Sequence, residues 1–130
     1  IKPNRFEAMK AVNPDWEGEE VSVDEAKKCG KELYERTRKP VYITIGKQGI
    51  LVFTEESGKV KCEHVSGIPL ECPIDPVGAG DSVSSGIALA LCSQASYQEA
   101  AFVGNLVASV TITKIGTTGT ASHEELLARL

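Results

Sequence analysis

Apolar residues recur at helical spacing in the first part of the chain, behind polar residues that can cap a helix. Asn4 predicts the start of a short helix that ends at about Val12. Ser22 and Glu25 form a capping box ahead of apolar positions near helical spacing, which predicts a helix over 23–36. The first third of the chain is therefore expected to contain two helices.

The pattern then changes from helical to extended. The β-branched run 41–45 predicts a buried strand, the glycine turn 46–49 leads out of it, and residues 50–54 predict a second strand. Weaker strands are expected over 60–65 and 68–72.

Three helices are predicted in the second half of the chain. The first covers 81–92, the second covers 96–113, and the third begins at Ser122. The second and third open on capping boxes. A polar loop over 116–120 separates them.

Composition narrows the class of protein without naming a function. The chain has 130 residues, of which 42% are hydrophobic and 25% charged, as expected for one globular domain with a sizeable core. A net charge of -4 with scattered Lys and Arg favours neither nucleic acid nor a membrane surface as partner, so we expect a small molecule. No apolar run is long enough to span a membrane.

Cysteine spacing and the first residue bear on location and completeness. The four cysteines lie far apart, with no C-x-x-C pair and no histidine at metal-ligand spacing. Reduced thiols in the cytoplasm are the expected state. Because the first residue is Ile1 rather than methionine, we expect the chain to begin inside a longer protein or after processing.

The run Asp75-Pro76-Val77-Gly78-Ala79-Gly80-Asp81-Ser82, just ahead of an apolar helical stretch, is the strongest chemical signal. Its small residues leave peptide N–H groups uncovered and the helix adds its positive end, which predicts a site for a transferring phosphate. Asp81 is then the candidate general base, and its alternative role is a helix N-cap. A dinucleotide fingerprint fits poorly, because it needs a strand directly before the turn and an acidic residue at a second strand end, whereas Glu99 falls at the start of a helix. A Walker loop also fits poorly, because no Gly-Lys-Ser/Thr follows the turn.

This run resembles the second signature of the ribokinase-like (PfkB) carbohydrate kinase family, usually Asp-Thr-x-Gly-Ala-Gly-Asp-Thr/Ser-Phe. Residues 2–7 are similar to the family's Asn-x-x-Glu motif, and residues 44–49 to its Thr-x-Gly-x-x-Gly segment. Asn105 and the loop 116–120 match its adenine-side helix and loop. The resemblance covers essentially the whole chain, but only the C-terminal part of the family's fold.

The resemblance implies the C-terminal portion of a three-layer α/β/α sandwich of the ribokinase-like type, with parallel strands and flanking helices. It implies ATP-dependent phosphoryl transfer to a hydroxyl of a sugar or related small alcohol, with Mg²⁺ and, as in some members, K⁺. The residues implied are Asp81, Gly78, Ala79 and Gly80 for catalysis; Thr44, Gly46, Gly49, Asn105, Gly116 and Gly119 for the nucleotide; and Asn4, Glu7 and Asp75 for metal ions.

From spacing alone, several of these residues have simpler roles. Asn4 and Glu7 stand one helical turn apart, as a cap followed by a solvated acid would. Gly46 and Gly49 suit a hairpin turn as well as nucleotide contact. For Asn105, an exposed or helix-packing amide is the default.

Other residues depart from the family pattern or look structural. Pro76 stands where threonine is usual, which removes a hydroxyl and an N–H, and Val83 stands where phenylalanine is usual. His64 and His123 have no visible partner for catalysis or metal binding. Cys72 is expected to be buried filler rather than a nucleophile.

Two functions therefore stay open. One is an ATP-dependent carbohydrate kinase, and the other is a non-catalytic nucleotide-binding or assembly module derived from such a kinase. The piece alone is expected to be inactive, because the residues that select the acceptor would lie mostly outside it. Its unpaired sheet edge leaves room for a homodimer.

Overall fold

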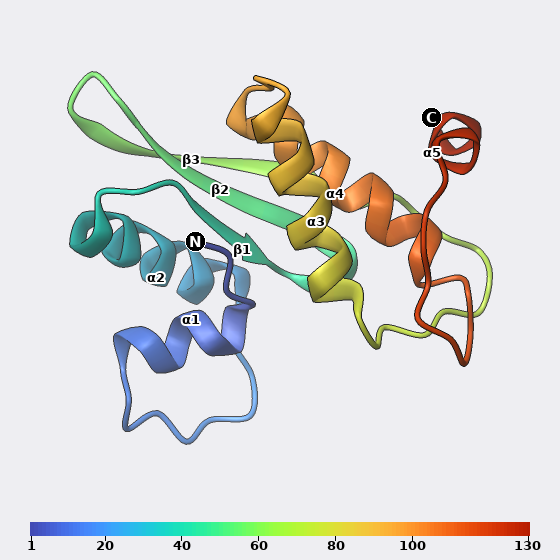
Figure 1. The fold of residues 1–130 in the computed structure, drawn as a ribbon. Coiled ribbons are helices and arrows are strands. Elements are labelled where there is room, and N and C mark those ends of the chain that lie inside the picture. Colours follow the sequence, from blue (N-terminus) through green and yellow to red (C-terminus); the bar gives the residue numbers. More distant parts are fainter. The chain divides into compact units, whose positions relative to one another are not determined.

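The computed structural model describes residues 1–130, which divide into two compact units, Ile1–Val65 and Ser66–Leu130 (Figure 1). The elements in chain order are α1 (Arg5–Val12), α2 (Val23–Thr37), β1 (Val41–Thr44), the 3-10 turn η1 (Gly46–Gln48), β2 (Gly49–Glu56), β3 (Lys59–Ser66), α3 (Ala79–Cys92), α4 (Tyr97–Thr111) and α5 (His123–Arg129).

The first unit is built on a three-stranded sheet in the order β1-β2-β3. Strands β1 and β2 are antiparallel, with Val41 opposite Phe53. Ser57 and Gly58 join β2 to β3, and both have positive φ angles, as the tight turn of a hairpin requires. Side chains from α1, α2 and the sheet form one hydrophobic core, in which Phe53 is among the largest fully buried side chains.

The expectation of parallel strands is wrong for these strand pairs, because a short glycine turn or hairpin can only join antiparallel neighbours. Parallel pairing is present beside β1, where the N-terminal residues lie along the strand. The N–H of Tyr42 donates to the carbonyl of Ile1 at 2.8 Å, and that of Thr44 donates to the carbonyl of Pro3 at 3.1 Å. An isolated parallel bridge between Asn4 and Thr44 continues this pairing.

The second unit consists of helices α3, α4 and α5. The first two pack with their backbones in close approach: a Cβ at Gly86 would lie 2.9 Å from the Cα of Gly104. Glycine at both positions is what lets the helices come together, because any side chain there would separate them. The buried residues of this unit are mostly small or aliphatic and lie on α3 and α4.

The predicted helices are all present, but one strand is not. Residues 68–72 form no strand, because Pro69 has no N–H to donate and no partner strand lies beside the segment. Cys72 in this segment is exposed, so its expected burial is wrong. Cys29 is buried, the other thiols are exposed, and all four are unpaired. None of the helices has the length and apolar character that crossing a membrane requires.

Candidate functional site

The glycine turn of the second unit ends where α3 begins. Gly78 is the N-cap residue, with φ +81°, and no side chain caps the helix. The N–H of Ala79 donates to the carbonyl of Pro76 at 3.1 Å, whereas the N–H groups of Gly78, Gly80 and Asp81 have no acceptor in the chain. Three uncovered donors at the positive end of a helix form an arrangement that can bind an anion.

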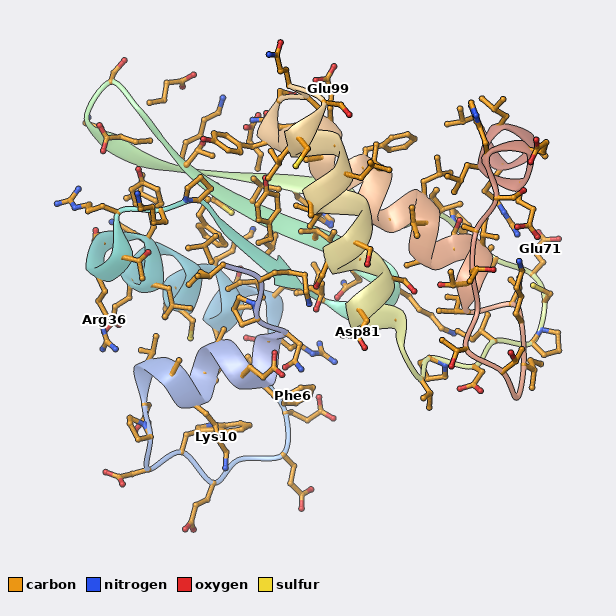
Figure 2. All side chains as sticks on the ribbon, viewed as in Figure 1. Phe6, Lys10, Arg36, Glu71, Asp81 and Glu99 are labelled. Carbon is orange, nitrogen blue, oxygen red and sulfur yellow. The ribbon has the colours of Figure 1, made fainter.

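Asp81 occupies the third position of α3, not the N-cap, so its alternative reading as a capping residue is wrong (Figure 2). Its side chain is exposed and accepts no hydrogen bond within the chain. The carboxylate is therefore available to a ligand, in the same first turn of α3 as the uncovered N–H groups.

In the other helices, the third position holds a glutamate instead of Asp81, and each of these helices begins with a complete capping box. There, the third-position glutamate accepts a hydrogen bond from the backbone N–H of the N-cap residue, at 2.7 to 2.8 Å. That hydrogen bond holds the pKa of Glu25 and of Glu99 below its usual range. The glutamates in this position are Glu7, Glu25, Glu99 and Glu125.

Asp75 connects the glycine turn to the loop 116–120. One carboxylate oxygen accepts from the N–H of Val77 at 3.0 Å, and the other lies 3.4 Å from the N–H of Gly116. The N–H of Asp75 donates to the carbonyl of Ile112, at the end of α4, at 2.7 Å. The structure thus brings together two segments that sequence analysis assigned to the nucleotide and a cation.

Thr111, a residue that sequence analysis did not single out, joins this loop to the start of α3. Its hydroxyl lies 2.9 Å from the hydroxyl of Ser82, the neighbour of Asp81. On the loop side, a Cβ at Gly119 would lie 2.5 Å from the Thr111 carbonyl oxygen. Gly119 is required by this close approach, whereas Gly116 has φ +73° and open space around it.

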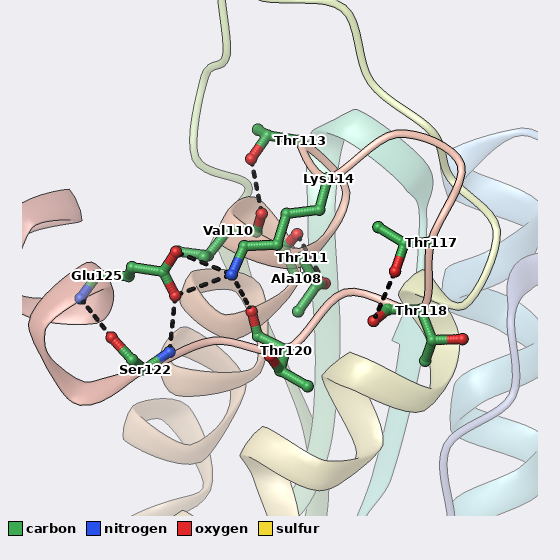
Figure 3. Close-up of polar contacts among 10 residues, drawn as sticks. All are labelled: Ala108, Val110, Thr111, Thr113, Lys114, Thr117, Thr118, Thr120, Ser122 and Glu125. Carbon is green, nitrogen blue, oxygen red and sulfur yellow. Dashed lines mark hydrogen bonds and ion pairs between the residues drawn. The ribbon is translucent and has the colours of Figure 1, made fainter.

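Sequence analysis placed Glu125 in a capping box but missed its ion pair with Lys114. The ammonium group of Lys114 binds both carboxylate oxygens of Glu125, at 2.8 and 2.9 Å, and the carbonyl of Thr120 (Figure 3). The hydrogen bond from Lys114 is the main reason that the pKa of Glu125 lies below its usual range.

Asn105 is buried in α4, and its side-chain N–H donates to the carbonyl of Ser66 at 3.1 Å. This contact joins α4 to the last residue of β3, so the expectation of an exposed amide is wrong. Its place beside an adenine ring stays a prediction.

The first unit holds the remaining predicted residues, and it brings Asn4 to Thr44 and Glu7 to Asn4. The side-chain oxygen of Asn4 accepts from the N–H groups of Phe6 and Glu7, both at 2.9 Å. Glu7 accepts from the N–H of Asn4 at 2.7 Å through one carboxylate oxygen and keeps the other free. Asn4 therefore acts as a cap here, and it also bridges Thr44.

Gly46 and Gly49 shape the turn between β1 and β2, with φ +64° and +104°. The N–H of Ile45 donates to the carbonyl of Gly49 at 2.9 Å, which closes the turn. His64, for which no catalytic or metal partner was expected, lies with Nε2 2.6 Å from the carbonyl of Gln48. This contact is structural, because it ties β3 to the turn.

The donor groups set limits on any metal ion. No group of three or more His, Cys, Asp or Glu residues is placed to hold one. The free oxygen of Glu7 fits a hydrated magnesium ion that takes most of its ligands from water and phosphates, as Mg²⁺ commonly does. Both oxygens of Asp75 face backbone N–H groups, so Asp75 would orient a cation site more than fill it.

Comparison with known proteins shows which family of proteins has these features. The model of the pfkB family of carbohydrate kinases matches residues 1–124. The bifunctional protein HldE of Desulfatibacillum aliphaticivorans is 33% identical over 132 residues, which cover 100% of this chain and 25% of that protein. The ribokinase of Haemophilus influenzae is 29% identical over 89% of this chain and 35% of its own length.

Comparison with solved structures points to the same family. Phosphofructokinase-2 from Escherichia coli, in complex with potassium, superposes with a TM-score of 0.80 at 29% identity, over 98% of this chain and 38% of that one. The fold is thus the ribokinase-like α/β fold, as expected, and only part of it is present. The chain belongs to the pfkB family of carbohydrate kinases. It spans about a quarter of the length of the HldE relatives that it matches.

Proposed function

We propose that residues 1–130 form the C-terminal nucleotide-binding and catalytic part of an ATP-dependent kinase whose acceptor is a hydroxyl of a sugar or related small alcohol. The observation that carries this proposal is the start of α3, where Asp81 is unbound beside three uncovered N–H groups within a family signature. Phosphofructokinase-2 solved in complex with fructose-6-phosphate, 26% identical to this chain, supports a sugar acceptor.

In the proposed reaction, the acceptor oxygen forms a bond to the γ-phosphorus of ATP while the bond between that phosphorus and the ADP oxygen breaks. The acceptor proton passes to the carboxylate of Asp81. The N–H groups of Gly78, Gly80 and Asp81 donate to the phosphate oxygens on which charge collects. Because the transition state is loose, the proton leaves late and a carboxylate is a sufficient base.

The other residues have supporting roles in this proposal. Glu7 would hold a hydrated magnesium ion, which would neutralise charge on the phosphates, and Thr44 with the turn Gly46–Gly49 would contact the nucleotide. Asn105, Gly116 and Gly119 lie on the adenine side. Asp75 orients a site for K⁺, and the phosphofructokinase-2 complex with potassium supports such a site.

Substitution of Asp81 in the intact protein tests this proposal. Asp81→Asn keeps the shape and removes the base, so turnover with a panel of sugars should fall by about 10²–10⁴-fold while ADP still binds. Asp24→Asn, at an exposed aspartate in the first turn of α2, is the matched control. Unchanged turnover in Asp81→Asn would contradict the mechanism. ADP binding by a wild-type protein that turns over no acceptor would instead support a non-catalytic nucleotide-binding module.

Location and assembly follow from the same proposal. We place the protein in the cytoplasm, where ATP is available and free thiols persist. Strand β3 is an edge of the described sheet and could pair with a second copy. Light scattering tests the homodimer, since a protein that is monomeric at the concentration used for the activity assay would exclude both the homodimer and the assembly role.

A further inference from the structure

Lys114 and Glu125 join the two ends of the loop 116–120. Lys114 follows the end of α4, and Glu125 lies in the first turn of α5. The ammonium group of Lys114 reaches across the loop to both Glu125 oxygens, at 2.8 and 2.9 Å, and to the carbonyl of Thr120 (Figure 3). One side chain therefore fixes the far end of the loop to its beginning.

The partner of Lys114 is itself held in place. One oxygen of Glu125 accepts from the N–H of Ser122 at 2.8 Å, and the Ser122 hydroxyl accepts from the N–H of Glu125 at 3.2 Å. An exposed pair of flexible side chains contributes little, because ordering both costs entropy. Here the capping box already orders the carboxylate of Glu125, so forming the ion pair costs the entropy of ordering Lys114 alone.

The contacts of Lys114 within the chain argue against the most direct alternative, that Lys114 binds a phosphate. A lysine ammonium group has three N–H donors. Lys114 donates hydrogen bonds to one carboxylate oxygen of Glu125 and to the carbonyl of Thr120, and the second Glu125 oxygen lies within ion-pair distance. The charge of Lys114 and two of its donors are therefore engaged within the loop and its flanks, so we expect its effect on a nucleotide to act through the loop.

The loop that Lys114 closes is also fixed at its other side. Gly116 meets Asp75, and Gly119 packs against the backbone of Thr111. The Thr111 hydroxyl in turn meets Ser82, next to Asp81. The position of the loop is thus tied to the start of α3 through contacts within the second unit.

We propose that Lys114, held by Glu125, is a positioning residue for nucleotide binding: it fixes the loop 116–120 without touching the nucleotide. This inference rests on the proposed function, because it assumes that the loop binds ATP and ADP. Lys114→Met should raise the Kd for ADP by roughly tenfold, as expected when a binding loop moves by part of an ångström. The kcat at saturating ATP should change much less, because the contacts of Lys114 do not include Asp81.

The experiment compares four variants of the intact protein by calorimetric titration with ADP and by turnover. Lys114→Arg should restore most of the affinity, because it keeps the charge and the donors. Glu125→Gln keeps the capping box but weakens the ion pair, so it should raise the Kd for ADP as Lys114→Met does. Lys61→Met is the matched control, since Lys61 binds Glu56 and Glu63 at 3.3 and 3.4 Å within the first unit.

Equal ADP affinity in wild type, Lys114→Met and Glu125→Gln would overturn the inference while leaving the proposed function intact. An equal loss in Lys61→Met would also overturn it, because the effect would then be general. A folded wild-type protein that binds no ADP would refute the proposed function and this inference together. Faster hydrogen exchange at amides 116–120 in Lys114→Met, with exchange in α3 unchanged, would support the inference directly.

Discussion

Replacing Gly119 by alanine tests whether the loop 116–120 must lie against α4. The new Cβ would stand 2.5 Å from the carbonyl oxygen of Thr111, 2.9 Å from its Cα and 3.0 Å from its carbonyl carbon. These are backbone atoms at the end of a helix, so they cannot rotate away. Ordinary contact begins at about 3.4 Å, and the loop must therefore move by most of an ångström.

That displacement sets the expected size of the effect. Overpacking of this kind costs about 1–3 kcal/mol, so the free energy of unfolding should fall by that amount. A shift of about 1 Å in a binding segment can lower kcat/KM by roughly 10²-fold. We therefore expect Gly119→Ala to weaken ADP binding strongly in the intact protein.

Gly116→Ala is the matched control in the same loop. No atom lies within 4 Å of the Cβ that it adds, and its φ of +73° makes the cost conformational, about 1–2 kcal/mol. It should lower stability without moving the loop away from Thr111. Urea unfolding and calorimetric titration with ADP measure both effects. A Gly119→Ala protein as stable as wild type, with wild-type ADP affinity, would refute the reasoning.

Two further predictions concern the helices. Gly30→Ala places a Cβ 2.1 Å from the buried ring of Phe53. The overpacking costs about 1–3 kcal/mol, which should outweigh the gain of about 1 kcal/mol in helix propensity, so the variant should be less stable than wild type. A higher urea midpoint would contradict this, and adding Phe53→Leu should recover part of the lost stability. Glu99 has its pKa lowered below 4.5 by the N–H of Ser96, so it stabilises the fold above pH 4.5 and this contribution is lost as the pH falls through the folded-state pKa. Glu99→Gln should therefore flatten the pH dependence of unfolding below pH 4.5, and superimposable pH profiles would argue against it.

The starts of most helices could be predicted because each is encoded within four residues. The boxes that begin at Ser22, Ser96 and Ser122 form in the structure as expected. The start of α3 was placed at Asp81, two residues too late, because Gly78 caps the helix through its backbone conformation alone. No side-chain signal marks that boundary.

Contacts between distant residues could not be predicted from spacing. His64 meets Gln48 across 16 residues, and Thr111 meets Ser82 across 29. Residues 68–72 carry the apolar pattern of a strand, but no neighbouring strand accepts them. Local pattern fixes which residues can form an element, whereas partners at long range decide whether they do.

The missing side-chain cap of α3 has a consequence for the order in which this part of the chain gains structure. The helices with complete capping boxes carry their own nucleation signals, since each box satisfies backbone donors early. The first turn of α3 has no such support, and glycine at its N-cap and second position raises the entropy cost of ordering it. We therefore expect this turn to fray in the free protein and to become rigid when an anion supplies the missing acceptors. Binding of the ligand would then order the first turn of α3, and with it Asp81, before the catalytic step.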